Sequence, residues 1–177
     1  MNCYILTGGR SERMGRSKAE LFLPRVVGAA APLFDDVVAV QRRGDPSLSI
    51  RTIHEGDHAD TAPVFGLVRA LEDATGPAFV MAVDYPNITT AALTEIRRHF
   101  EASTAPMAVP VWRGIAQPLC AGYRPAVLPV IHDRISKGKL DLLGLMKDVA
   151  AATFPFDGRE LMNVNTPDDL AKAERVE

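Results

Sequence analysis

A glycine-rich loop near the N-terminus carries the residues whose types and spacing most clearly suggest chemistry. An apolar run ends at Leu6 and Thr7, and the next eleven residues, Gly8 to Lys18, contain three glycines and four cations. Glycine lets backbone N–H groups come close to a ligand. Such groups near a helix N-terminus, with Arg and Lys around them, bind phosphate oxygens. The alternative is an ordinary strand-to-helix turn, but Arg13 and Lys18 beside the glycines favour a phosphate site.

The spacing in this loop differs from that of two common phosphate-binding motifs. A Walker A loop has four residues between its glycines and a Lys directly after the second glycine. Here five residues separate Gly9 from Gly15, and Lys18 follows Gly15 by three positions. The dinucleotide-binding pattern Gly-x-Gly-x-x-Gly is also absent. Both motifs are therefore excluded.

Asp84 is the second candidate, because it ends a run that is apolar at every position from residue 78 to residue 83. A carboxylate at such a place is costly unless it meets solvent, a hydrogen-bond donor or a cation. Magnesium shared with a phosphate is a natural partner, since Mg²⁺ prefers one or two carboxylates together with phosphate oxygens and water. The alternative is that Asp84 only turns the chain ahead of Pro86.

Two asparagines near the C-terminus form the third candidate. Asn163 and Asn165 alternate in an extended segment, so their side chains are expected on the same side. One amide oxygen could complete a metal shell while the other amide orients a loop, or both could satisfy backbone groups of a turn. Asn165 is the better metal candidate because it directly precedes a helix start, with Thr166 as N-cap and Pro167 at the first helical position.

Strands and helices are predicted to alternate along the chain, which favours a three-layer α/β/α domain with a mainly parallel central sheet and a Rossmann-like arrangement. We expect residues 1–177 to form a single domain. Ligands of such sheets bind at the carboxyl ends of the strands, so the Gly8–Lys18 loop and Asp84 are expected in one crevice. Pro24 is expected to stop the first helix. The predicted strands lie within residues 1–7, 37–40, 49–54, 78–83, 107–112, 118–123 and 152–156, and the helices within 19–23, 26–34, 64–71, 89–100, 126–135, 140–150 and from 166 onward.

Composition excludes several classes of protein. The hydrophobic fraction of 47% and the charged fraction of 24% are typical of a globular chain. The net charge of −2 provides no overall basic field, so nucleic acid is not an expected partner. No apolar run approaches the ~18 residues of a membrane span, and no secretory pattern opens the chain, so a cytoplasmic protein without membrane association is expected. Cys3 and Cys120 indicate small buried residues rather than a disulfide framework.

The N-terminal loop resembles, residue for residue, the signature of the molybdenum cofactor guanylyltransferases, small nucleotidyltransferases that make molybdopterin guanine dinucleotide. That family opens with Leu-Ala-Gly-Gly, a short polar stretch, Arg-Met-Gly and then a Lys. This chain has Leu6-Thr7-Gly8-Gly9, Arg13-Met14-Gly15 and Lys18. An Asp two places before a Pro is the second signature of the family, and Asn163-Val164-Asn165-Thr166-Pro167-Asp168-Asp169-Leu170 is similar to its closing motif.

The resemblance implies a nucleotidyltransferase fold and Mg²⁺-dependent transfer of GMP from GTP to the terminal phosphate of molybdopterin, with release of pyrophosphate. It also implies transient contact with proteins that deliver or receive the cofactor. The segment from Gln117 to Arg124 is similar to the one that lines the pterin site, where Arg124 would reach an anionic substrate or simply be solvated. The roles implied are catalysis for Arg13, Lys18 and Asp84; nucleotide binding for Leu6, Thr7, Gly8, Gly9, Gly15, Lys18, Glu55, Asp57, Gly66 and Asp84; and metal binding for Asp84 and Asn165, with Asn163 as the alternative.

Departures from the family pattern fall on base and ribose recognition. Val40 stands where the family has a strand-end Asn, and Ala62 stands where it has a Gly before Pro. The family's guanine-contacting acid aligns with Glu55, or with Asp57 if a gap is allowed. Relatives that use CTP have Ala-Gly where this chain has Gly8-Gly9, so the resemblance favours guanine as the base. Two alternatives remain: a nucleotidyltransferase with another acceptor or with CTP as donor, and a nucleotide-binding protein that has lost transfer activity.

Overall fold

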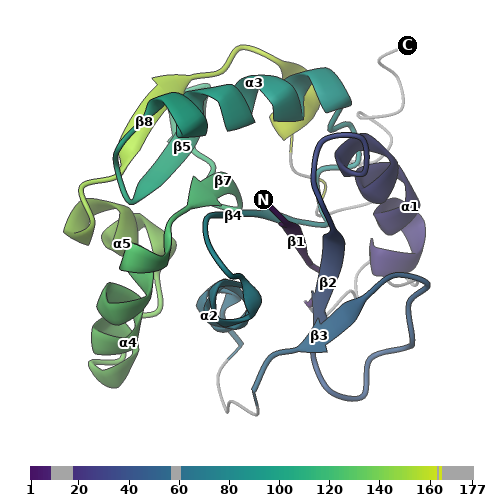
Figure 1. The fold of residues 1–177 in the computed structure, drawn as a ribbon, viewed down its shortest axis with the longest axis horizontal. Helices are drawn as coiled ribbons and strands as arrows, with labels where there is room; N and C mark the ends of the chain where they lie inside the picture. The colour runs from purple at the N-terminus through teal and green to yellow at the C-terminus, as the bar shows by residue number, and fades with distance from the viewer. Residues whose placement is uncertain (9–17, 57–60, 163, 165–177) are drawn as a thin grey trace.

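The computed structural model describes residues 1–8, 18–56, 61–162 and 164 of the chain. These residues form one mixed sheet with helices on both faces (Figure 1). The strand order is β3-β2-β1-β4-β7-β5-β6, and β8 pairs with β5. The strands are β1 (Cys3–Leu6), β2 (Val37–Gln41), β3 (Thr52–His54), β4 (Ala78–Ala82), β5 (Met107–Trp112), β6 (Ile115–Ala116), β7 (Cys120–Tyr123) and β8 (Ala152–Pro155).

Most strand pairs in this sheet are parallel, as the alternating pattern predicts. Strands β1, β2, β3 and β4 are mutually parallel, and β8 is parallel to β5. The exceptions are β7, which is antiparallel to both β4 and β5, and β6, which forms a hairpin with β5. The predicted α/β class and mainly parallel sheet are therefore confirmed.

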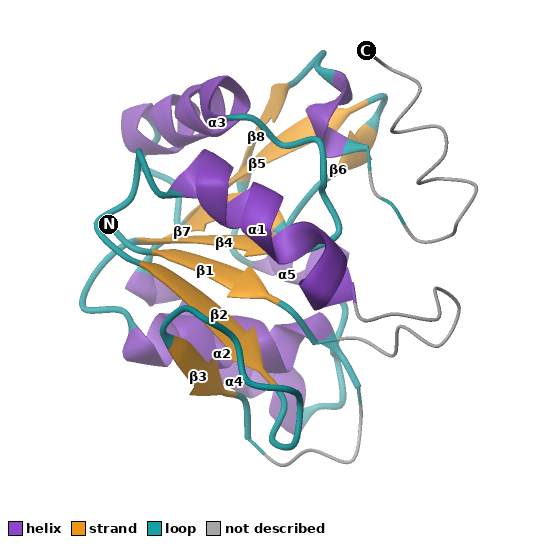
Figure 2. Cartoon of the chain, turned by 90° about the vertical axis from the view of Figure 1, so that its right-hand side faces the viewer, coloured by secondary structure: helices purple, strands orange, loops and turns teal. Residues whose placement is uncertain are grey.

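Helices on the two faces complete three layers, with α1 and α3 on one face and α2, α4 and α5 on the other (Figure 2). Each layer buries its own hydrophobic cluster against the sheet. None of the described helices combines the length and apolar character that a membrane crossing requires. The helices are α1 (Lys18–Ala30), α2 (Pro63–Asp73), α3 (Thr90–Ala102), α4 (Leu128–Ser136) and α5 (Leu142–Asp148), with 3₁₀ turns at Pro125–Val127 and Arg159–Leu161.

Strand β4 lies at the centre of the sheet, and all of its residues are buried. Phe79 and Met81 pack toward α1 and α3, whereas Ala78 and Val80 pack toward α2 and α4. A parallel strand covered on both faces needs apolar residues at every position rather than an alternation. The continuous apolar run of β4 is thus explained by its central place.

The first helix differs from its prediction, because α1 continues through Pro24 to Ala30. Proline removes one backbone hydrogen bond from a helix, to the carbonyl of the residue four positions earlier. Pro24 and Glu20 are both exposed, while Phe22 and Val26 are buried against the sheet. Water can therefore satisfy the carbonyl of Glu20, and the packing of the buried face keeps the helix intact.

Candidate active site

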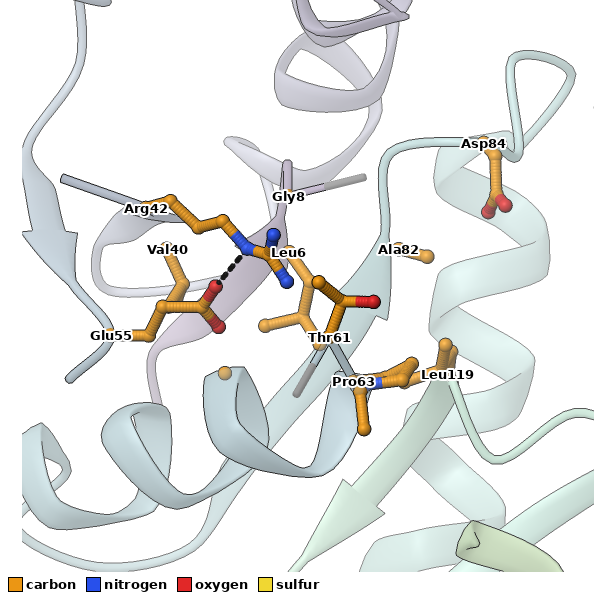
Figure 3. Close-up of a pocket in the computed structure, with 12 residues that line it drawn as sticks. Leu6, Gly8, Val40, Arg42, Glu55, Thr61, Pro63, Ala82, Asp84 and Leu119 are labelled. Carbon is orange, nitrogen blue, oxygen red and sulfur yellow. Dashed lines mark hydrogen bonds and ion pairs between the residues drawn. The ribbon is translucent and has the colours of Figure 1, made fainter. Parts of the chain in front are cut away.

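A pocket of about 340 Å³ opens at the carboxyl ends of β1, β2 and β4, where the topology places a ligand site (Figure 3). Apolar side chains form much of its surface, and Arg42, Glu55, Thr61 and Asp84 contribute polar groups. Its lining residues are Leu6, Gly8, Val40, Arg42, Glu55, Thr61, Ala62, Pro63, Gly66, Ala82, Asp84 and Leu119.

Backbone hydrogen bonds hold the strand ends in register at the mouth of this pocket. The N–H of Thr7 donates to the carbonyl of Val40 at 3.0 Å, and the N–H of Val83 donates to the carbonyl of Leu6 at 3.1 Å. The Thr7 hydroxyl also donates to Val40, at 3.0 Å. The side chain of Thr7 therefore fixes the start of the glycine loop on β2 and does not line the pocket.

Glu55 and Arg42 form one wall of the pocket as an ion pair. The Nε atom of Arg42 donates to Oε1 of Glu55 at 2.8 Å. Two glycines flank the carboxylate: a Cβ atom on Gly8 would lie 3.6 Å from Oε1, and one on Gly66 would lie 3.5 Å from Oε2, both ordinary contact distances. A Cβ on Gly66 would lie only 3.1 Å from the Leu6 side chain. Glycine at position 66 thus lets α2 pack close to β1.

Asp84 lies across the pocket from the Arg42–Glu55 pair (Figure 3). Its Oδ1 atom is buried, and its carbonyl accepts a hydrogen bond of 2.9 Å from the N–H of Val164. The Val164 side chain is fully buried in the cluster beneath α1 and α3. The middle residue of the Asn163–Asn165 motif is therefore anchored beside Asp84, although the motif lies more than 70 residues later in the chain.

Tyr85, next to Asp84, holds the segment before β7. Its hydroxyl donates to Oε1 of Gln117 at 3.0 Å, and the Gln117 amide group donates to the carbonyl of Ile115 at 3.3 Å. Burial raises the pKa of Tyr85 well above its ordinary value, and the nearby Cys120 and Asp84 raise it further. Tyr85 therefore stays a neutral hydrogen-bond donor at physiological pH and fixes the orientation of the Gln117 amide.

Arg124 lies away from the pocket, at the opposite edge of the sheet. Because β7 runs antiparallel to β4, its last residue pairs with Ala78, at the start of β4. The Arg124 guanidinium donates to the carbonyls of Ser103 and Ala105 at the end of α3, at 2.6 and 3.1 Å. The structure thus departs both from the prediction that Arg124 reaches a substrate and from the prediction that it is simply solvated: its partly buried side chain binds the loop between α3 and β5.

The structure brings together several of the predicted site residues: Leu6, Gly8, Glu55, Gly66 and Asp84 line the pocket. Lys18 is the first residue of α1, so the glycine loop leads directly into a helix N-terminus, and its side chain is outside the described part of the molecule. Also outside the described residues are Gly9, Arg13, Gly15, Asp57, Asn163 and Asn165.

Sequence reasoning missed Arg42, Thr61, Pro63 and Ala82 as pocket residues. Arg42 and Ala82 could have been found by extending one rule to every strand: the residues at the carboxyl end of a parallel strand face the ligand edge. Leu119 belongs to the segment that the family resemblance assigns to the substrate site, and it lines the pocket just before β7. The N–H of Ala82 donates to its carbonyl at 2.9 Å.

Comparison with known proteins agrees with this architecture. The family model of the MobA-like NTP transferase domain matches residues 3–149. A Mycobacterium marinum protein named "Probable molybdenum cofactor guanylyltransferase" is 31% identical, over 94% of this chain and 89% of that one. A Bacillus licheniformis protein of the same name is 29% identical, over 96% and 94% of the two chains.

A solved structure has the same fold over almost the whole chain. The molybdopterin-guanine dinucleotide biosynthesis protein A of Archaeoglobus fulgidus superposes with a TM-score of 0.84, covering 99% of this chain and 98% of that one at 22% identity. The family match spans most of the sequence, and the pocket occupies the ligand edge of the shared fold. The chain therefore belongs to the MobA-like NTP transferase family and is a nucleotidyltransferase.

Proposed function

We propose that this enzyme transfers GMP from GTP to the terminal phosphate of molybdopterin and releases pyrophosphate. One observation carries the proposal: Gly8 of the glycine loop, the Glu55 wall and Asp84 line the same pocket at the carboxyl edge of the sheet. The pocket thus joins a predicted phosphate loop, polar groups for a base and a carboxylate for a metal. The names of the relatives support guanine as the base and molybdopterin as the acceptor.

The chemistry requires positioning more than proton transfer. An oxygen of the acceptor phosphate, already an anion at neutral pH, forms a bond to the α-phosphorus of GTP. The bond from that phosphorus to the bridging oxygen breaks, and pyrophosphate leaves with the electron pair. The enzyme must bring two polyanions together and hold the attacking oxygen in line. Backbone N–H groups of the glycine loop, with Arg13 and Lys18, would stabilise the charge on the phosphates.

Asp84 fits the requirements of a magnesium ligand. Its carboxylate oxygens are hard donors at the ligand edge, and Mg²⁺ commonly takes one or two carboxylates plus phosphate oxygens. Among the described residues no group of three His, Cys, Asp or Glu side chains could hold a metal, so phosphate and water oxygens would complete the shell. Asn165, or alternatively Asn163, would add an amide oxygen, because Val164 is anchored on Asp84. Bound Mg²⁺ would neutralise charge on the leaving pyrophosphate.

The apolar part of the pocket suits a nucleobase. Leu6, Val40, Pro63 and Gly66 provide a surface without charge on which a planar ring can lie. Glu55 supplies acceptors for a base that carries N–H donors, as guanine does. Asp57, four residues before the pocket residue Thr61, is the alternative acid from the same loop.

The test is a transfer assay with molybdopterin, MgCl₂ and either GTP or CTP, followed by detection of both pyrophosphate and the dinucleotide product. The proposal expects GTP-dependent formation of both products. Formation of the product from CTP would favour the alternative donor. The departures from the family pattern at Val40 and Ala62, both in the pocket, favour a further alternative, a nucleotide-binding protein without transfer activity. Binding of GTP without release of pyrophosphate would support that second reading.

A further inference from the structure

We infer that Arg42, held in the pocket wall by Glu55, helps to select the base by donating a hydrogen bond to O6 of guanine, beside the acceptors that Glu55 supplies. The inference rests on the proposed function and deepens it, since it concerns the base site of the same pocket. Arg42 would then be a specificity-determining residue rather than a cation that merely balances Glu55.

The two side chains are held beside each other by neighbouring strands. Arg42 directly follows β2, Glu55 directly follows β3, and the N–H of Glu55 donates to the carbonyl of Gln41 at 2.9 Å. The pairing of β2 with β3 therefore places the backbones of Arg42 and Glu55 side by side, so that their side chains can form an ion pair. Their ion pair at 2.8 Å is 35% exposed at the Arg42 side chain and 13% exposed at the Glu55 side chain. The polar groups of the ion pair therefore face the pocket and are partly shielded from bulk solvent.

The contact leaves hydrogen-bonding capacity on both partners. It uses Nε of Arg42, and a guanidinium carries four further N–H donors on its two terminal amino groups. A carboxylate accepts at both oxygens, with about four lone-pair sites in all. Gly8 lies next to Oε1 and Gly66 next to Oε2, so no side chain from either residue covers these atoms. Figure 3 shows the guanidinium and carboxylate side by side on the pocket wall.

In the inferred complex, a terminal N–H of Arg42 and the two carboxylate oxygens of Glu55 would face the base in the order donor, acceptor, acceptor. Guanine presents the complementary order on its Watson–Crick edge, with acceptor O6 and donors N1–H and N2–H₂. Cytosine presents donor, acceptor, acceptor and would meet like groups at each position. Adenine places a donor against Arg42, and uracil places its O2 acceptor against the carboxylate. Among the four common bases only guanine matches, because a buried mismatch leaves polar groups unpaired.

If the Arg42–Glu55 pair had a purely structural role, substitutions in it would have a different effect on nucleotide binding. A partly exposed ion pair contributes little stability, and if it only braced the ends of β2 and β3, its loss would affect all nucleotides alike. If the pair instead forms hydrogen bonds with the base, the change in nucleotide affinity should depend on which polar atoms the base carries. Inosine triphosphate separates the two partners, because it keeps O6 and N1–H but lacks the 2-amino group.

The experiment measures binding of GTP, ITP, ATP and CTP with Mg²⁺ by calorimetry, for the wild type and for Arg42→Met, Glu55→Gln and Arg43→Met. Wild type is expected to bind GTP about tenfold more tightly than ITP, and more tightly still than CTP or ATP. Arg42→Met should weaken GTP and ITP together by about tenfold or more, since both use O6, and leave CTP nearly unchanged. Glu55→Gln should bring the GTP and ITP affinities together. Arg43→Met removes an adjacent cation from outside the pocket lining and should preserve every ratio.

Equal losses for GTP and CTP in Arg42→Met, or no loss at all, would overturn the inference while leaving guanylyl transfer intact in the wild type. Unchanged discrimination between GTP and ITP in Glu55→Gln would also overturn it. A wild type that binds none of these nucleotides would contradict the proposed function itself, so the two failures are distinguishable. Thermal unfolding of each variant establishes that the fold is retained; Glu55→Gln keeps the test possible if Arg42→Met does not fold.

Discussion

Asp84 is the proposed metal ligand, and Lys18 is one of the proposed phosphate-binding cations. Asp84 follows the central strand β4, whereas Lys18 begins α1 at the end of the glycine loop. In the proposed reaction, a carboxylate would hold the metal while cationic and backbone donors hold the phosphate oxygens. Each role makes a prediction that substitution of a single residue can test.

Replacing Asp84 with Asn should abolish the magnesium dependence of GTP binding, because an amide lacks the charge that holds a divalent cation. Calorimetric titration of GTP with and without MgCl₂ measures this dependence. Asp133→Asn is the matched control, since Asp133 is an exposed carboxylate on α4. An Asp84→Asn protein with the metal dependence of the wild type would rule out Asp84 as the ligand.

Replacing Lys18 with Ala should lower the rate of guanylyl transfer at least ~100-fold, the scale of one lost donor that stabilises developing charge. The rate of pyrophosphate release at saturating GTP measures the effect. Arg25→Ala is the control, because Arg25 is an exposed cation on the same helix. Near-normal turnover of Lys18→Ala would remove Lys18 from the catalytic groups.

Sequence reasoning located site residues where a motif or a buried strand marked them. Asp84 was found because its carboxylate follows a wholly apolar run, and Glu55 and Gly66 were found by alignment with a family pattern. Arg42 was not found, since a strand-end Arg reads as solvated until its partner is known. The partner, Glu55, directly follows the next strand, and only the pairing of β2 with β3 brings the two together.

Gly122 shows how closely α3 and β7 approach, and it has a packing role. A Cβ atom at this position would lie 2.2 Å from the ring of Phe100. We predict that Gly122→Ala lowers the free energy of unfolding by about 1–3 kcal/mol, the usual cost of overpacking a core. Urea denaturation measures the change. Gly28→Ala in α1 is the matched control, because an added Cβ meets no atom within 4 Å there, and it should not destabilise the fold. A neutral Gly122→Ala would contradict the close packing.

Asp73, the last residue of α2, links this helix to the beginnings of β1 and β3, far from the pocket. Asp73 accepts hydrogen bonds of 2.9 Å from Tyr4 and from Arg51. Burial acts to raise the pKa of Asp73, but the two hydrogen bonds, together with the charges of Arg51 and Arg69, outweigh it and hold the pKa below its ordinary value of 3.8. A folded-state pKa below the unfolded value means that the stabilisation is complete above the unfolded pKa and is lost as the pH falls through the folded one.

We therefore predict that Asp73→Ala destabilises the protein by about 1–2 kcal/mol at pH 7, and that the difference from wild type shrinks below about pH 4, near the ordinary pKa of an aspartate. Urea unfolding at a series of pH values measures the difference. Asp133→Ala, at an exposed pair with Lys137, should show no such trend. A difference that stayed constant down to pH 2 would contradict the assigned role of Asp73.

At the level of elements, apolar periodicity predicted most strands and helices because buried faces dominate their residue choice. The predicted helix end at Pro24 was wrong. Burial of the apolar face of α1 stabilises the helix by more than the loss of one solvent-exposed backbone hydrogen bond at Pro24 destabilises it. The β5–β6 hairpin was also missed. Its turn has positive φ at both Arg113 and Gly114, with values of 50° and 79°, a geometry typical of tight hairpins, but Arg is not a residue that signals it.

For the whole molecule, the topology explains why Gly8, Glu55 and Asp84 line one pocket although they come from distant segments. Parallel strands β1, β2, β3 and β4 all end at one edge, and the two helical layers cover both faces of the sheet. This leaves the ligand edge as the place where polar residues gather in a pocket. In the proposed complex, GTP and magnesium bind there, with the base against Arg42 and Glu55 and the metal on Asp84.

A crystal structure with GTP and Mn²⁺ in place of Mg²⁺ would show whether the nucleotide and the metal bind in this pocket, because the anomalous signal of manganese locates the metal independently of the nucleotide. We expect an anomalous peak within about 2.5 Å of an Asp84 carboxylate oxygen, within the range of oxygen ligation. The α- and β-phosphates should lie between it and the glycine loop, with guanine against Leu6, Gly66 and Glu55. A metal peak away from Asp84, or a nucleotide bound outside this pocket, would contradict the account.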